Sequence, residues 1–512
     1  MTQFYFFYFY NMFVRKKLNK SGSISIQVIT KIKGKSKLIK TIGSSKDEKT
    51  INELILQAKE YISSYKGQQK LNFSDDFSSI KSTFNKISKH TEIGTELLLG
   101  KIYNDIGFNK LDKIFKYLVF ARLVYPVSKL KTSDYLIKYK AVDIPIQQIY
   151  RYLDKLYNEQ KEQIQQISYE HTLKILGKQI SIVFYDVTTL YFQIDDEDEI
   201  RKRGFSKEGK HQNPQIVLGL LVSIDGYPLA YEIFEGNKFE GHTMLPVIDR
   251  FKQKYNIDKL IIVADSGLLS CQNITELREK GYDFILGARI KNEKQNIKDK
   301  ILSLNLENGE SKIIEIQNSL KLIISYSNKR AQKDKYNRER GLKRLEKQIK
   351  TGKLTKSNIN NRGYNKYLKM DGDVTISIDM NKYNKDAKWD GLKGYVTNTN
   401  LAKDEIIENY GHLWKIEKAF RISKHDLKVR PIYHRLQRRI EAHITINFVA
   451  YKIYKELERQ LKEKKANISP EKAINIAKTI YQITAIDNGI IVKHNLILTD
   501  EQRYLSQLFN FG

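Results

Sequence analysis

Hydrophobic and polar residues alternate along residues 12–43, with short glycine-containing turns between the alternating runs. A period of two predicts strands, so we expect a small antiparallel sheet here. Residues 47–65 carry apolar side chains at helical spacing, which predicts an amphipathic helix. We therefore expect a small sheet plus one helix in residues 1–73. The polar, serine-rich residues 74–92 are predicted to be a linker.

Residues 93–175 have a helical pattern almost throughout. Within them, residues 128–158 predict two helices separated by a turn near residues 142–145. The second helix presents Arg151, which would reach a DNA groove if the pair is a helix-turn-helix. An ordinary helical hairpin remains equally open, because the turn contains no glycine.

From residue 179 strands begin to alternate with helices, which predicts an α/β core. We assign its first part to residues 176–290 and its second part to residues 401–450. The predicted elements are strands at 179–192, 258–264 and 282–289, a hairpin at 214–236 with Asp225-Gly226 at its turn, and a helix at 244–255.

Residues 291–400 interrupt this rhythm and predict a β-rich insertion. Within it, residues 329–369 contain 15 Lys or Arg against 3 Asp or Glu. This run is either a solvated helix and loop or an arm that follows DNA, with Lys335 and Arg338 as candidate phosphate contacts. The C-terminal residues 451–512 are predicted to be helical.

The chain carries a formal charge of +30, from 89 Lys or Arg and 59 Asp or Glu. Such an excess favours a polyanionic partner, above all nucleic acid, although codons rich in A and T account for part of the lysine content. A single cysteine, Cys271, excludes an internal disulfide and fits a reducing cytoplasm. No apolar run is long enough for a membrane helix. We expect Met12 to be the initiator, with residues 1–11 as upstream read-through.

Two apolar strands run into an aspartate, in YDVTT at Asp186 and in VADSG at Asp265. Ligand sites in α/β proteins gather beyond the carboxyl ends of strands. Two carboxylates placed close together repel, and a divalent cation such as Mg²⁺ relieves that repulsion. We therefore expect Asp186 and Asp265 to share a metal. The alternative is that each aspartate caps the turn that follows it.

A third carboxylate, Glu417, lies in residues 410–431, which predict one helix. Leu413, Phe420, Arg421 and Lys424 fall on the same face as Glu417. This arrangement suits a metal-binding glutamate beside cations that hold phosphates. The alternative is a surface ion pair between Glu417 and Arg421, which would contribute little to stability.

In these three segments the sequence resembles the DDE transposases of bacterial insertion sequences, in the subgroup whose third catalytic segment reads Y-x2-R-x3-E-x6-K. Tyr410, Glu417 and Lys424 match this spacing, whereas Leu413 stands at the arginine position. Lys415 or Arg421 could supply the missing contact. The segments GFSKEGK, EGNKFEGHT and RPIYH also resemble the family, and the resemblance spans most of residues 12–450.

The resemblance implies a ribonuclease H-like mixed sheet flanked by helices, with two Mg²⁺ ions (or Mn²⁺) held by Asp186, Asp265 and Glu417. It implies cleavage at the ends of an element and strand transfer into target DNA. Tyr410, Arg421 and Lys424 would contact DNA near the cleaved end. The implied partners are double-stranded terminal repeats and target DNA, bound by a homodimer associated with the nucleoid.

Three other functions remain open at this point. A metal-dependent nuclease of the same fold would cut without joining. A remnant that binds DNA without chemistry would tolerate Glu417→Gln. An RNA-binding protein acting through charge alone would explain neither Asp186 nor Asp265.

Overall fold

The computed structural model of the chain describes residues 12–32, 35–65, 86–177, 179–206, 209–316, 320–360, 363–371, 375–487 and 490–511. The chain forms two compact units, residues 1–88 with 484–492 and residues 89–483 with 493–512. Residues 1–11 and most of the predicted linker lie outside the described residues. The interpretation of residues 1–11 as upstream read-through therefore stays a prediction.

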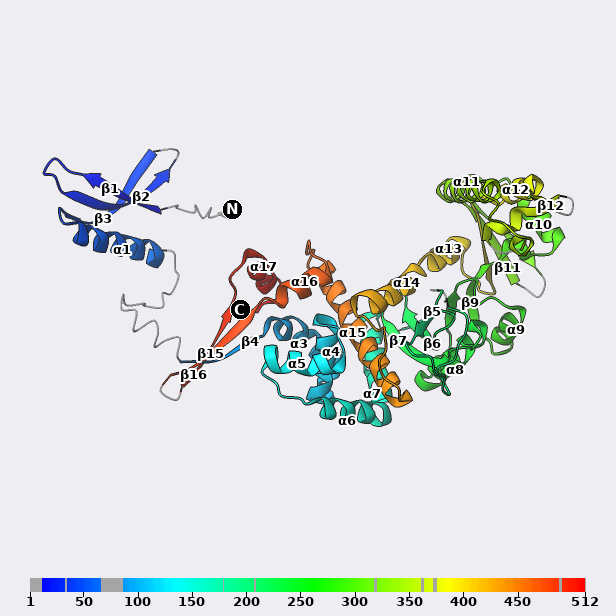
Figure 1. Ribbon diagram of the computed structural model, residues 1–512, viewed down its shortest axis with the longest axis horizontal. Coiled ribbons are helices and arrows are strands. Elements are labelled where there is room, and N and C mark those ends of the chain that lie inside the picture. Colours follow the sequence, from blue (N-terminus) through cyan, green and yellow to red (C-terminus); the bar gives the residue numbers. More distant parts are fainter. Residues whose placement is uncertain are drawn as a thin grey trace. The chain divides into compact units, whose positions relative to one another are not determined.

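Residues 12–65 of the first unit form three antiparallel strands in the order β1-β2-β3 and one helix (Figure 1). Ile26 and Val28 of β2 pack against Ile51 and Ala58 of the helix, which gives this unit its own small core. The predicted strands and helix are confirmed. Their bounds are β1 Met12–Leu18, β2 Ile24–Ile32, β3 Lys35–Ser45 and α1 Glu48–Tyr65.

The second unit begins with a bundle of helices packed around one long apolar helix, α15 (Gln437–Glu463). The helix pair predicted in residues 128–158 is present as α5 and α6, and its residues 141–145 connect them. Whether this pair reads DNA stays a prediction. The bundle comprises α3 Gly94–Ile106, α4 Lys113–Val124, α5 Lys129–Lys140, α6 Ile146–Lys155 and α7 Lys161–Ile175.

An eight-stranded mixed sheet lies beside this bundle, in the order β10-β11-β14-β9-β8-β5-β6-β7. β5, β8 and β9 are parallel, and the other neighbours are antiparallel. The predicted mixed α/β architecture is confirmed and is consistent with a ribonuclease H-like core. The bounds are β5 Ile182–Tyr191, β6 Gln215–Ser223, β7 Pro228–Glu235, α8 Met244–Tyr255, β8 Ile261–Ala264, α9 Cys271–Glu279 and β9 Asp283–Ala288.

Three strands of the predicted insertion extend this sheet, and two others, β12 and β13, pair with each other in a separate small sheet. β14 (Leu392–Thr397) pairs with β9, and β11 (Leu320–Tyr326) and β10 (Ser311–Ile316) continue outward from it. The basic run forms a long helix, α11 (Asn328–Lys350). The smaller elements are α10 Gln295–Leu302, β12 Leu368–Asp371, β13 Thr375–Ile378 and α12 Met380–Ala387.

Two local predictions near the ends of the second unit are wrong. Residues 451–512 are not helical throughout, because Tyr481, Ile483 and Ala485 alternate and form a strand after α16. Residues 87–92, placed in the linker, form β4 and pair with that strand. The bounds are β4 Ile87–Glu92, α16 Pro470–Ala477, β15 Tyr481–Asp487, β16 Ile490–Leu496 and α17 Asp500–Phe509. Within the described ranges, no helix combines the length and apolarity needed to cross a membrane.

Candidate active site and basic arm

Asp186 and Asp265 each directly follow the last paired residue of two neighbouring parallel strands. Tyr185 of β5 pairs with Ala264 of β8, and each aspartate is the next residue along its chain. Adjacent strands are about 4.8 Å apart, and residues in the same register point to the same face. The two aspartates therefore branch from neighbouring backbone positions at this end of the β5–β8 pairing.

The expectation that both aspartates end a strand is wrong for Asp186. β5 continues to Tyr191, because β6 pairs with it antiparallel along its whole length. β8 does end at Ala264, and the Gly267 amide donates to Asp265 Oδ1 at 2.8 Å. Asp265 thus orders the turn that follows it, while its second oxygen is left for another role.

Tyr410 of α13 (Lys403–Gly411) packs over the loop that carries Asp265. A Cβ added at Gly287 would lie 2.3 Å from the Tyr410 hydroxyl and 2.9 Å from the Ser266 amide nitrogen. Burial raises the pKa of Tyr410, and the negative charge of Asp265 raises it further. The Lys393 ammonium lies 4.4 Å from the centre of the Tyr410 ring.

Glu417 of α14 (Trp414–Arg421) is exposed and belongs to the same neighbourhood. Burial and the positive charge of Arg330 lower the pKa of Lys393, and the charge of Glu417 opposes that shift. Among the residues that the structure describes, no three His, Cys, Asp or Glu side chains converge to hold a metal. Asp186, Asp265 and Glu417 are therefore not assembled as a complete ligand set.

The prediction of one helix over residues 410–431 is wrong. α13 ends at Gly411, α14 starts at Trp414, and a wider turn over residues 422–426 ends the helical segment. Leu413 and Phe420 face the core, but Glu417 and Arg421 are exposed. Lys424 lies half-buried in the wider turn.

Leu413 stands where the third family segment has an arginine, and its side chain packs in the core instead of reaching the site. Leu413 is 8% exposed and packs in the core between α13 and α14. Lys415 does not replace the arginine, because its ammonium donates to the Ile224 carbonyl at 2.6 Å, in the turn between β6 and β7. Arg421, which is exposed, remains as the candidate.

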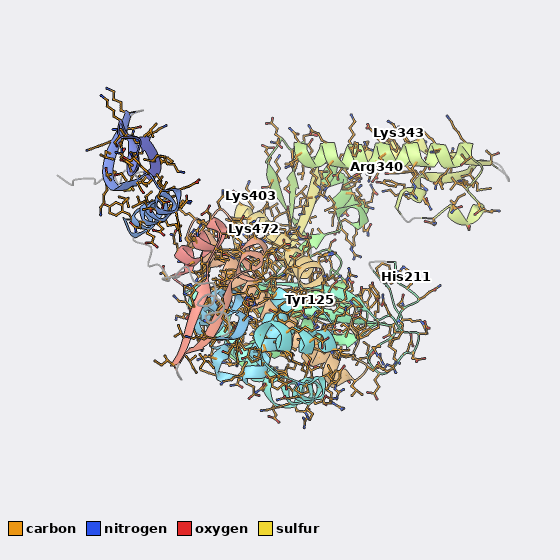
Figure 2. All side chains as sticks on the ribbon, turned by 60° about the vertical axis from the view of Figure 1, so that its left-hand side comes forward. Tyr125, His211, Arg340, Lys343, Lys403 and Lys472 are labelled. Atoms are coloured by element: carbon orange, nitrogen blue, oxygen red, sulfur yellow. The ribbon has the colours of Figure 1, made fainter. Side chains whose placement is uncertain are left out.

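The predicted DNA-binding residues outside this centre differ in exposure. Arg151 and Lys335 are exposed, as are Arg340 and Lys343 on α11 (Figure 2). Arg338 is only 8% exposed and forms an ion pair with Asp390. Its guanidinium holds α11 against the segment before β14, so an exposed phosphate contact is not its role in this conformation.

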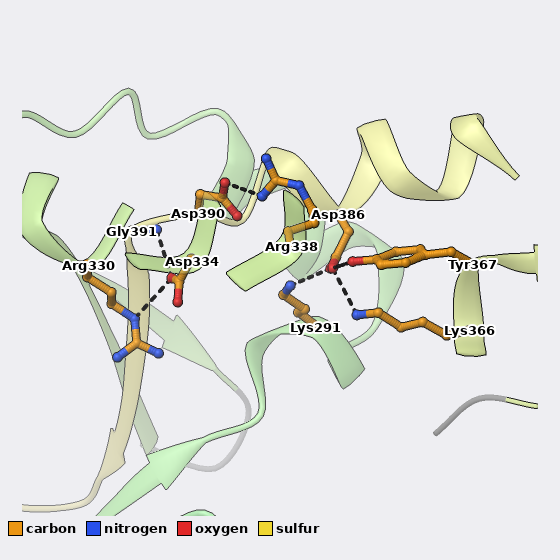
Figure 3. Close-up of polar contacts among 9 residues, drawn as sticks. All are labelled: Lys291, Arg330, Asp334, Arg338, Lys366, Tyr367, Asp386, Asp390 and Gly391. Carbon is orange, nitrogen blue, oxygen red and sulfur yellow. Dashed lines mark hydrogen bonds and ion pairs between the residues drawn. The ribbon is translucent and has the colours of Figure 1, made fainter. Parts of the chain in front are cut away.

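Polar contacts at the base of α11 surround a pocket of about 520 Å³ (Figure 3). Asp386 accepts from Lys291, from Tyr367 and from Lys366 at 2.8 Å. Arg330, in contact with Asp334 at 3.5 Å, lines the same pocket. Sequence reasoning missed the three basic side chains here that lie outside the basic run, Arg289, Lys291 and Lys393.

Arg289 connects this pocket to the aspartate loop. Its Nε donates to the Ser266 carbonyl at 2.8 Å, and one terminal nitrogen donates to the Gly267 carbonyl at 3.3 Å. The guanidinium therefore fixes the loop immediately after Asp265. Lys393, which lines the same pocket, lies against the Tyr410 ring.

The family model described as "Transposase DDE domain" matches residues 177–453. The chain belongs to the DDE transposase family. Membership makes the chain an enzyme of phosphoryl transfer on DNA, and the family's chemistry is DNA cleavage and strand transfer. No curated protein matches the transposase sequence at a significant level.

Two solved transposase structures show limited similarity to the chain. A piggyBac transposase synaptic complex with hairpin DNA has 9% sequence identity and a TM-score of 0.37, over 75% of this chain and 78% of that chain. A Mos1 transposase paired-end complex with the left transposon end has 8% identity and a TM-score of 0.16, over 45% and 66%.

Proposed function

We propose that this transposase cuts at the terminal repeats of a bacterial insertion sequence and joins the cut ends to target DNA, using Asp186, Asp265 and Glu417. The observation that supports the proposal is that Asp186 and Asp265 directly follow Tyr185 and Ala264, the last paired residues of the parallel β5–β8 ladder. Glu417 would be the third ligand, supplied from α14, which packs against β5.

The side chains present fit divalent cations of the Mg²⁺ or Mn²⁺ type. All three candidate ligands are carboxylates, and hard cations prefer oxygen. The Gly267 amide occupies only one oxygen of Asp265. When bound, two such ions would activate the attacking hydroxyl and stabilise the leaving oxygen during in-line displacement.

The neighbouring side chains would position the DNA. Lys393 carries a positive charge beside the Tyr410 ring, so it would neutralise the phosphate that approaches Asp265. Arg289 keeps the aspartate loop in place through two carbonyl groups. Arg421 and Lys424 would hold the strand next to the cut, and Lys335 and Arg151 would contact duplex further away. Two DNA ends must be joined in one event, so we propose a homodimer on DNA.

Cleavage of the element's own ends tests the proposal. Purified protein is incubated with labelled duplex carrying the inverted repeats that flank its gene, with Mg²⁺ or with EDTA. We expect Mg²⁺-dependent cuts at the repeat boundary for the wild type. Asp186→Asn and Asp265→Asn should lower the rate by about 10³-fold or more while DNA binding persists.

Asp258→Asn is the matched control, because Asp258 is an exposed aspartate at the opposite end of β8. It should cleave like the wild type. Cleavage without any joined product would favour a nuclease of the same fold. Binding without cleavage in all four proteins would instead favour a remnant that only binds DNA.

A further inference from the structure

A second basic pocket, of about 540 Å³, lies in the helical part of the second unit. The turn between α4 and α5 forms one wall, and the segment of residues 428–434 forms the other. Its polar lining includes Arg122, Lys129, Arg430, His434 and His443, and no carboxylate lines it. The proposed catalytic residues are not among the lining groups.

Three of these bases are almost completely buried. Arg122, Lys129 and His443 are 5%, 6% and 5% exposed. Arg122 donates from one terminal nitrogen to the carbonyls of Leu427 and Lys428, at 3.4 and 3.2 Å, but its Nε has no partner within the described part of the chain.

The other two bases are also incompletely satisfied. His443 Nε2 contacts the Val429 carbonyl at 2.9 Å, and its Nδ1 has no partner within the described part of the chain. Among the described residues, none forms a hydrogen bond or ion pair with the Lys129 ammonium.

The pKa shifts agree with this lack of counter-charge, because burial disfavours the positive forms of these side chains. Burial lowers the pKa of Lys129 well below its usual value, and the charge of Arg122 lowers it further. Burial and these two cations lower the pKa of His434 to about 3. Asp154 is the carboxylate that opposes this shift, and it already pairs with Arg438 and Arg439. Buried cations without counter-charge are strongly unfavourable, so the pocket is built for an anion.

We propose that this pocket binds a backbone phosphate of the DNA substrate. A phosphodiester supplies the negative charge and the acceptor oxygens that the Arg122 and Lys129 donors lack. The N-terminus of α5, capped by Ser128, opens onto the same space and adds a favourable dipole.

The position of the pocket relates it to the proposed active site. The Arg430 guanidinium, which lines the pocket, lies 5.6 Å from the centre of the Tyr191 ring. Tyr191 is the last residue of β5, the strand that carries Asp186. A DNA strand reaching the aspartates can therefore be held further along by this pocket. The inference rests on the proposed function, and the experiments below separate the two.

Thermal unfolding with inorganic phosphate tests the anion site. Phosphate is compared with chloride at equal ionic strength, for the wild type, Lys129→Met and the control Lys138→Met. Lys138 is exposed and lies further along α5, away from the pocket. We expect phosphate to raise the Tm of the wild type and of the control, but not of Lys129→Met. Without phosphate, Lys129→Met should be at least as stable as the wild type, because the cost of burying an amino group without a partner is gone.

DNA binding then identifies the source of the phosphate. For terminal-repeat duplex, the slope of log affinity against log salt should fall by about 0.9 in Lys129→Met and stay unchanged in Lys138→Met. If Lys129→Met does not fold, Lys131→Gln at the exposed lip of the pocket replaces it. A phosphate effect on Tm with an unchanged slope would mean a free-anion site and would overturn the proposal, as would no change in either measurement.

End cleavage by the wild type keeps this test separate from the proposed function. A wild type that cleaves, with an unchanged salt slope in Lys129→Met, would leave the function standing and remove the pocket from DNA binding. A reduced slope in a protein that never cleaves would support the pocket and contradict the catalytic proposal.

Discussion

The hydroxyl group of Tyr410 fills the space where a side chain at Gly287 would begin, and the Ser266 amide closes that space from the other side. Gly287→Ala should therefore move the loop after Asp265. We expect a loss of about 1–3 kcal/mol in the free energy of unfolding and roughly a 10–100-fold loss in cleavage rate. Urea unfolding and the end-cleavage assay measure both effects.

A double variant separates steric displacement from other effects at this position. Because the Tyr410 hydroxyl is the nearest atom, Gly287→Ala with Tyr410→Phe should recover part of the lost stability. Gly100→Ala is the control, since a Cβ at Gly100 in α3 meets nothing within 4 Å. Equal effects of the alanine substitution at both glycines would contradict the proposed clash.

Two neighbouring cations of α11 should behave differently. Lys335 is exposed, so Lys335→Gln should leave stability unchanged and lower the salt slope of DNA binding by about 0.9. Arg338 is buried with Asp390, so Arg338→Gln should cost about 1–3 kcal/mol by leaving that carboxylate unpaired. Thermal unfolding and fluorescence anisotropy at several salt concentrations distinguish the two. Reversed results would restore Arg338 as a DNA contact.

Restoring the arginine of the third motif should not improve the enzyme. Leu413 packs in the core, so Leu413→Arg would bury a guanidinium without a partner and cost about 2–3 kcal/mol. Leu413→Met, which keeps the volume, should cost less than about 1.5 kcal/mol. Unfolding curves and cleavage rates for both variants provide the check. A stable Leu413→Arg protein that cuts faster than the wild type would show that this position reaches the active site.

The buried His171 of α7 predicts how stability depends on pH. Burial, followed by the charge of Lys452, lowers its pKa to about 3, whereas Glu456 opposes the shift. Between the unfolded value of about 6.5 and the folded value, only the unfolded state binds the proton, so stability falls as pH falls. His171 should contribute about 2 kcal/mol to the loss of stability between pH 7 and pH 5.

Urea unfolding at both pH values measures this contribution. His171→Gln removes the titrating group, so its stability should change less with pH than that of the wild type. His425→Gln, at an exposed histidine, should keep the wild-type dependence. An unchanged pH dependence in His171→Gln would show that other groups cause the loss.

Local pattern predicted most strands of the second unit, because buried strands are continuous apolar runs with turn residues at their ends. The hairpin at Asp225-Gly226 and the helix Met244–Tyr255 follow from such signals. The break between α13 and α14 did not follow from such signals, since it depends on Leu413 packing into the core. Nor could local pattern place β14 between β9 and β11, a pairing between segments far apart in the chain.

Some residues of the candidate site could likewise be predicted from the sequence, and others could not. Asp186 and Asp265 were found because a carboxylate following an apolar strand is conspicuous in sequence. Lys393 stands at the start of the segment KGYVTNTN, next to an apolar strand, and gave a similar but unused signal. Arg122 and Lys129 gave none, because what marks them is burial without a counter-charge, which exists only once α4, α5 and the 428–434 segment are packed together.

The continuation of β5 beyond Asp186 has a consequence for where DNA is cut. Tyr191 is the fifth residue after Asp186 along the strand, a span of about 17 Å, or about five base pairs of duplex at 3.4 Å each. Because a strand paired on its whole length does not stretch, it would set a fixed interval between the phosphate held beside Arg430 and the phosphate that is cut. The distance from this bound phosphate of the DNA backbone would then determine the cleavage position, in addition to the DNA sequence.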